Sequence, residues 1–280
     1  GRDRAAARPG DLEGGREQAD VPASELQRVR LVPEPELDLV GGAEGVKKEA
    51  ISLLHAKECP SKITTVILDT TQLALQIHES CGHAAELDRT FGDEVSFAGA
   101  TFLSSDKLGK FRYGSKLINI TADATCEGGV GTFAFDDEGV VAQKIPIIKD
   151  GIFVGYLSSR EAAHKIGGRS SGAMRASGWS ALPLIRMTNI NLEPGESSLE
   201  ELISDTKDGI LLATNKTWSI DDMRLNFQFG TEIGWEIKNG KVGDVLKNPF
   251  YTGITPDFWA SCSGIANSKY WKLHGIPNCG

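Results

Sequence analysis

The stretch FDDEGVVAQKIPIIKDGIFVGYL, residues 135–157, contains two turn signals between runs of apolar and β-branched residues. They are Glu-Gly at 138–139 and Asp-Gly at 150–151, where glycine readily adopts the positive φ that tight hairpins need. A third signal, Asn-Gly at 239–240, lies within WEIKNGKVGDVL, residues 235–246. These turns predict antiparallel meanders instead of βαβ units. The expected class is therefore α+β, with a large antiparallel sheet or a barrel-like β domain.

Helical patterns are fewer and shorter than the strand signals. Apolar residues recur at helical spacing over residues 46–54, and the apolar run TTVILDT at 64–70 then fits a buried strand. A second helix is predicted from Thr71 to about Gly82. Two short helices are predicted within 158–168 and 197–209, where a serine precedes a glutamate by three residues, as in a capping box.

Composition excludes several classes of protein. Thirty Lys and Arg against 38 Asp and Glu give a net charge of −8, the wrong sign for gripping nucleic acid or an anionic membrane. The 40% apolar and 24% charged fractions are those of a globular chain. No apolar run approaches the roughly 18 residues of a membrane span, and no signal peptide opens the sequence. We expect a soluble, cytoplasmic protein with no direct nucleic-acid or membrane partner.

The first residues differ in composition from the rest. Residues 1–46 contain six Arg and no Lys, and no aromatic residue appears before Phe91. Such a segment cannot bury enough apolar surface to offset the entropy of ordering it. Residues 1–33 are therefore predicted to be a disordered leader or a segment foreign to the fold, with a peripheral helix around residues 24–32 as the alternative.

The segment LALQIHESCGHAAELDR, residues 73–89, contains the pattern HExxxH, formed by His78, Glu79 and His83. Two imidazoles on one helix can share a metal when they lie on one face, but an offset of five turns roughly 140° past a full turn of regular α-helix. A π-bulge would realign them, or the helix ends at Gly82 and His83 swings back. The pattern alone leaves two interpretations open, a metal site and ordinary polar residues on a helix flank.

Two histidines leave a catalytic zinc short of its usual third protein ligand, for which a carboxylate or a thiolate is the candidate. Cys279 lies in the turn-forming sequence HGIPNCG near the end of the chain. The five cysteines are widely spaced and form no CxxC pair, which argues against a disulfide framework. Cys81, between the two histidines, is expected to pack in the core.

The segment QIHESCGHAAELDRTFGDEVSFAGATF, residues 76–102, resembles the metal-binding helix of the TldD/PmbA family, also called modulators of DNA gyrase. Further matches include KFRYGSKLINITADAT at 110–125, WSIDDMRLNFQFGTEIGWEIKNGK at 218–241 and GIPNCG at 275–280. The resemblance begins at about Gly45. It implies an intracellular zinc metallopeptidase that resembles the TldD-like subunit, with a metal-binding helix and a few short helices beside the β-structure.

The resemblance also implies the roles of single residues. His78, His83 and Cys279 would bind zinc, and Glu79 would be the catalytic glutamate. The substrate would be unfolded peptides or small proteins admitted to an enclosed chamber, formed by a homodimer or by a heterodimer with a PmbA-like subunit. Residues 34–280 would then be a TldD-like metallopeptidase domain, truncated at the C-terminus and without the family's N-terminal domain.

A competing interpretation belongs to another class. The chain could be a non-catalytic binding subunit, stabilised by its metal, that modulates a partner such as gyrase. Structural zinc usually has four protein ligands, whereas three are counted here, and three ligands with one open position are typical of catalytic zinc. The ligand count therefore favours the enzyme.

Overall fold

The computed structural model describes residues 39–276. The predicted leader 1–33 and the predicted ligand Cys279 lie outside these residues. The chain divides into two compact units, 1–48 and 49–280, and each is considered by itself. Helix α3 (Leu39–Leu54) spans the boundary and confirms the first predicted helix. None of the helices within 39–276 combines the length and apolar composition needed to cross a bilayer.

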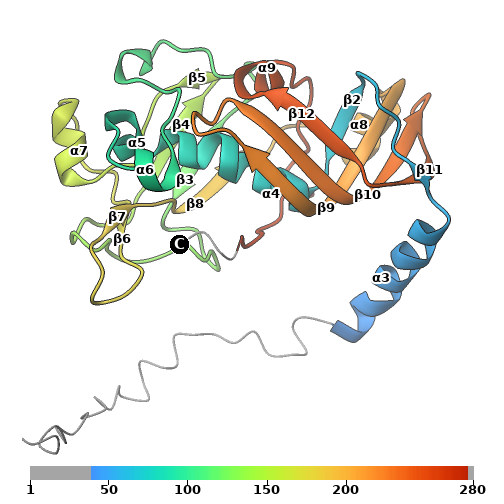
Figure 1. The fold of residues 1–280 in the computed structure, drawn as a ribbon, viewed down its shortest axis with the longest axis horizontal. Coiled ribbons are helices and arrows are strands. Elements are labelled where there is room, and N and C mark those ends of the chain that lie inside the picture. Colours follow the sequence, from blue (N-terminus) through green and yellow to red (C-terminus); the bar gives the residue numbers. More distant parts are fainter. Residues whose placement is uncertain (1–38, 277–280) are drawn as a thin grey trace, which may run out of the picture. The chain divides into compact units, whose positions relative to one another are not determined.

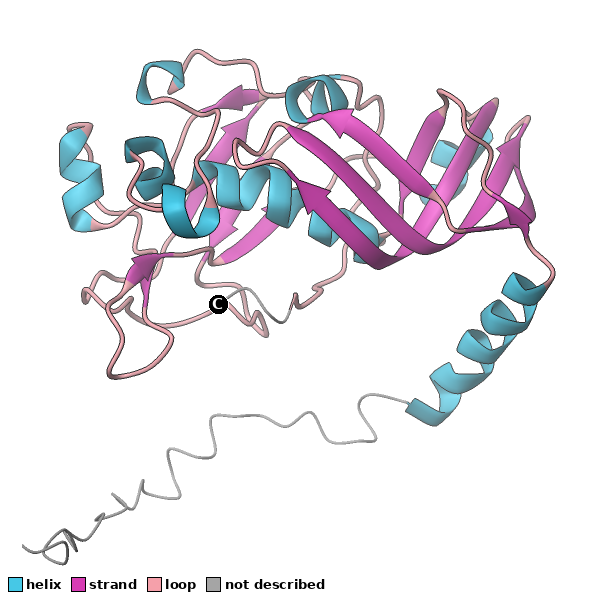
Figure 2. Ribbon diagram, in the orientation of Figure 1, coloured by secondary structure: helices cyan, strands magenta, loops and turns pink. Residues whose placement is uncertain are grey.

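The described part of the second unit, residues 49–276, contains three sheets (Figures 1 and 2). The largest sheet consists of β1 (Lys57–Glu58), β2 (Thr65–Leu68), β9 (Asp208–Ile220), β10 (Asn226–Lys238), β11 (Lys241–Lys247) and β12 (Phe250–Ile254). Its strand order is β1-β11-β10-β9-β2, and β12 also pairs with β10. The second has the order β5-β4-β3-β8, from β3 (Ile120–Asp123), β4 (Lys144–Lys149), β5 (Ile152–Phe153) and β8 (Asn189–Leu192). A small hairpin joins β6 (Met174–Arg175) to β7 (Leu184–Ile185).

The predicted α+β class is confirmed, and the hairpin turns lie where the sequence places them. Asp150 and Gly151 connect β4 to β5 with φ of 50° and 75°, and Asn239 and Gly240 connect β10 to β11 with φ of 49° and 74°. Positive φ at both central residues is the requirement that such dipeptides satisfy. The barrel alternative is wrong for the described residues, because the large sheet stays open, with β1 and β2 as its ends.

The strand predicted at 64–70 forms but is not buried. It is β2, at the edge of the large sheet, with Thr65 exposed and the other three residues half-buried. It pairs with β9 in parallel, and β1 pairs with β11 in parallel, so the large sheet is mixed instead of purely antiparallel. The sequence pattern missed this because a short apolar run is equally compatible with a central and an edge strand.

Short helices occupy the connections between strands. They are α4 (Thr70–Ile77), α5 (Leu87–Phe91), α6 (Val95–Ala98), α7 (Arg160–Lys165), α8 (Leu199–Ser204) and α9 (Thr255–Ala260). The capping box predicted at Ser198 and Glu201 is confirmed at the start of α8. The predicted cap of α7 is displaced by one residue, since Ser159, and not Ser158, accepts the Ala162 N–H at 2.9 Å.

Helix α4 lies between the two larger sheets, in contact with both β9 and β8 (Figure 1). One apolar core joins Ile77 at the end of this helix to Ile120 of β3 and Leu192 of β8. The second core lies on the large sheet and includes Leu212, Phe229 and other buried residues of β9 to β12. Packing on both sides fixes the position of α4, which leads directly into the HExxxH segment.

Candidate metal centre

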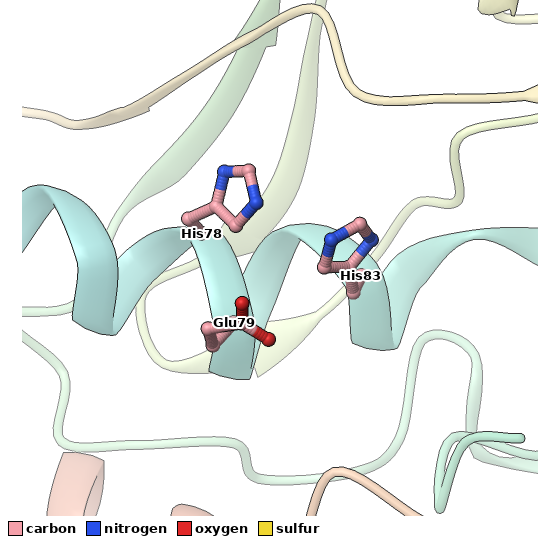
Figure 3. A group of neighbouring side chains, drawn as sticks. All are labelled: His78, Glu79 and His83. Carbon is pink, nitrogen blue, oxygen red and sulfur yellow. The ribbon is translucent and has the colours of Figure 1, made fainter. Parts of the chain in front are cut away.

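The HExxxH segment forms a π-helix, His78–Gly82, directly after α4. Its final backbone bond runs from the His83 N–H to the His78 carbonyl, the i to i+5 pattern that defines a π-turn. The two imidazole rings lie with centroids 4.8 Å apart and planes at 87° (Figure 3). One potential ligand atom from each of His78, Glu79 and His83 lies within 4.8 Å of the others. The π-bulge hypothesis is thus confirmed.

The alternative use of Gly82 is wrong, because this glycine has an ordinary right-handed conformation with φ −63° and ψ −65°. Its role is steric. A Cβ at this position would lie 1.9 Å from Sδ of Met187, which precedes β8 and is buried. Gly82 therefore lets the π-turn approach the neighbouring sheet closely, a requirement that local sequence could not reveal.

Replacing Gly82 by alanine is expected to destabilise the fold by roughly 1–3 kcal/mol, the usual cost of overpacking a dense core. Urea unfolding of the two proteins measures the difference. Gly243→Ala is the matched control, because its added Cβ meets only Glu236 O at 3.7 Å. Equal stability of Gly82→Ala and the parent would show that Met187 moves away without cost.

The environment of His78 keeps its ring neutral. Burial is the main cause that lowers the pKa of His78 to about 3; the neighbouring His83 contributes in the same direction, and Glu86 acts in the opposite direction. A neutral imidazole retains a nitrogen lone pair, which is the form that binds a metal.

His83 is held by a buried carboxylate. Glu86 is fully buried, and its Oε2 lies 3.0 Å from His83 Nδ1 and 2.5 Å from Arg89 Nε. Burial opposes ionisation, but His83 and Arg89 together lower the pKa of Glu86, so it is a carboxylate at neutral pH. Arg89 Nη2 also lies 3.2 Å from His83 Nδ1. We assign the proton to Nδ1, donated to the closer Glu86 carboxylate, which makes Nε2 the candidate ligand atom. Carboxylates commonly orient metal-binding histidines in this way.

Glu79 is oriented from another part of the chain. Its Oε2 accepts a hydrogen bond from Arg224 Nη1 at 2.9 Å, and both side chains are largely buried. Arg224 adopts a left-handed backbone with φ 62°, and its carbonyl accepts the Thr255 hydroxyl at 2.8 Å. The carboxylate of Glu79 therefore has a fixed direction next to the two imidazoles.

A zinc ion suits this donor set. Two imidazoles converge, one neutral by burial and one oriented by a carboxylate, and these are the ligand type and outer-shell arrangement typical of catalytic zinc. Cys81 is not a candidate ligand, since it is buried in the core and its pKa is raised to about 12. The predicted packing role of Cys81 is confirmed. The other three histidines, His55, His164 and His274, are exposed.

A large cavity of about 1720 Å³ opens beside His78. His78 lies in its wall, together with the edge strand β2 and parts of the segments 128–131 and 258–276. Tyr270 and Trp271 line this cavity, and Trp259 borders it from the core, where its side chain is 2% exposed.

Sequence reasoning did not identify three residues of this site, Glu86, Arg89 and Arg224. Glu86 and Arg89 follow His83 at spacings of three and six, which could have suggested contact along a helix. Arg224 is 145 positions from Glu79, and nothing local connects the two.

Comparison with known proteins gives the class of this chain. Residues 61–278 match the family model described as the PmbA/TldA metallopeptidase C-terminal domain, and the chain belongs to this family. It is 39% identical over 234 residues to Metalloprotease MJ0996 of Methanocaldococcus jannaschii, covering 84% of this chain and 49% of that protein. It is 28% identical over 211 residues to a protein named Zinc metalloprotease TldD homolog from Saccharolobus solfataricus, covering 75% and 45%.

A solved structure shares the fold. TM0727 from Thermotoga maritima superimposes with a TM-score of 0.68 at 22% identity, over 79% of this chain and 48% of that one. The chain spans about half the length of the curated relatives it matches.

Proposed function

We propose that this chain is the catalytic part of a zinc-dependent metallopeptidase that cleaves unfolded peptides or small proteins. The observation that carries the proposal is the π-turn, which places His78 and His83 side by side with Glu79 adjacent. A regular helix would separate the imidazoles. The name of the Saccharolobus relative supports zinc as the metal.

In this proposal His78, His83 and Cys279 hold the zinc. One observation supports the assignment of Cys279. His78 lines the same cavity as Gly275 and Ile276, and Cys279 follows Ile276 by three residues in the sequence.

Bound zinc would polarise the scissile carbonyl and lower the pKa of a water molecule. The chain's own residues supply the rest of the chemistry. Glu79, fixed by Arg224, would accept the proton of the attacking water and return it to the leaving amine. Glu86 would hold the His83 ring with Nε2 toward the metal. Both carboxylates are buried, which strengthens their hydrogen bonds to Arg224 and His83.

The cavity beside His78 suggests how substrate binds. Strand β2 has β9 as its one partner strand among the described residues, and it lines this cavity. An extended peptide would add to this edge through main-chain hydrogen bonds, which give little side-chain specificity. That mode suits unfolded chains. A homodimer or a PmbA-like partner subunit, and a cytoplasmic location, stay predictions.

The proposal is tested by incubating the full chain, loaded with one equivalent of zinc, with an unfolded reporter peptide. Cleavage that is lost with a chelator and restored by zinc is expected. Zinc binding without cleavage, in the presence and absence of a PmbA-like subunit, would contradict an enzyme and favour the metal-stabilised binding subunit. Absence of zinc binding would contradict both.

A further inference from the structure

We infer that Ser80, Tyr113 and Trp259 are positioning residues that select the π-turn over a regular helix and thereby set the spacing of His78 and His83. The inference rests on the proposed function for the role of the histidines. The part of the inference that concerns the conformation of the turn is independent of the proposed function, because this conformation can be measured without metal.

Ser80 is the middle residue of the π-helix and is completely buried. Its hydroxyl donates to the carbonyl of Gln76 at 2.5 Å, where the α-helix meets the π-turn. The same oxygen accepts the Gln76 Nε2 at 3.2 Å and the Trp259 Nε1 at 3.0 Å. A hydroxyl has one donor and two acceptor positions, so every one of them is used.

The backbone of Ser80 is held as well. The buried hydroxyl of Tyr113 donates to the Ser80 carbonyl. Tyr113 and Trp259 are themselves connected, because the Ser115 N–H donates to the Trp259 carbonyl at 3.0 Å, two residues beyond Tyr113. Both aromatic donors thus reach Ser80 from buried segments of the core that are hydrogen-bonded to each other.

These contacts distinguish the two possible turns. Changing the π-turn to regular α-helix would rotate the residues that follow, moving the Ser80 hydroxyl and carbonyl relative to donors that cannot follow them. The buried Trp259 N–H and Tyr113 O–H would then lose their acceptors, a large cost for groups without access to water. His83 would also turn away from His78. The three residues therefore favour the one conformation in which the histidines converge.

The experiment compares Tyr113→Phe with Tyr156→Phe. Tyr156 is a matched control, since its buried hydroxyl also donates to a backbone carbonyl, that of Leu103 at 2.8 Å. Ser80→Ala is the second test variant. Hydrogen exchange of the amides at 78–83 is measured by mass spectrometry in the metal-free full chain, with thermal unfolding as the measure of stability and competition with a chelator as the measure of zinc affinity.

We expect Tyr113→Phe and Ser80→Ala to speed exchange at 78–83 and to raise the zinc Kd by about 10-fold or more, the usual size of outer-shell effects. Tyr156→Phe should lower Tm about as much as Tyr113→Phe does, but it should leave the exchange rates at 78–83 and the zinc Kd unchanged. If all three variants behave alike, or if exchange at 78–83 does not change, the inference is wrong. If the parent chain binds no zinc yet the exchange difference appears, the proposed function fails and the control of the turn stands.

Discussion

Replacing Glu79 by glutamine is expected to abolish peptide cleavage while zinc content stays close to that of the parent. Glutamine keeps the size of the side chain and can still accept the Arg224 hydrogen bond through its carbonyl oxygen, but it cannot take a proton from water. Loss of a general base typically lowers the rate by about 10²–10⁴-fold. Cleavage of the reporter peptide and zinc content of the same sample measure the two effects.

Glu94→Gln is the control for this substitution. Glu94 is another buried glutamate paired with an arginine, Arg186, at 3.3 Å. It does not belong to the His78, Glu79 and His83 group. Both variants alter a buried ion pair, yet only the change at Glu79 should remove activity. Loss of zinc from Glu79→Gln would instead make Glu79 a ligand, which its position within 4.8 Å of the imidazoles allows.

His78→Ala is expected to remove zinc and activity together. The substitution deletes a proposed zinc ligand. Zinc affinity should therefore fall by well over the roughly 100-fold that is the upper limit for changes to residues that only orient a ligand. Zinc content after dialysis and competition with a chelator measure it. His164→Ala, at an exposed position on α7, is the control and should behave like the parent. Full zinc retention in His78→Ala would mean that the metal binds elsewhere.

The sequence predicted those features of the fold that depend on neighbouring residues. The turns at Asp150-Gly151 and Asn239-Gly240 follow from two adjacent positions, and the capping box follows from Ser198 and Glu201, three residues apart. The parallel pairing of β2 with β9 joins strands about 140 residues apart, and no local pattern encodes it.

The candidate site shows the same division. The offset of five between the histidines predicted a distorted helix, but it could not choose between a π-turn and a helix end. That choice depends on Met187, which excludes a side chain at position 82, and on Tyr113 and Trp259, which hold Ser80. All three are distant in sequence and meet the π-turn only in the folded protein. The same is true of Arg224, which fixes Glu79.

X-ray absorption at the zinc edge tests the central claim most directly. The full chain is loaded with one equivalent of zinc, and the scattering shells around the metal are fitted. The proposed site predicts two imidazole nitrogens at about 2.0–2.1 Å and one sulfur at about 2.3 Å. A shell of nitrogen and oxygen without sulfur would contradict Cys279 as a ligand, and a spectrum without imidazole scattering would contradict the π-turn histidines as the metal site.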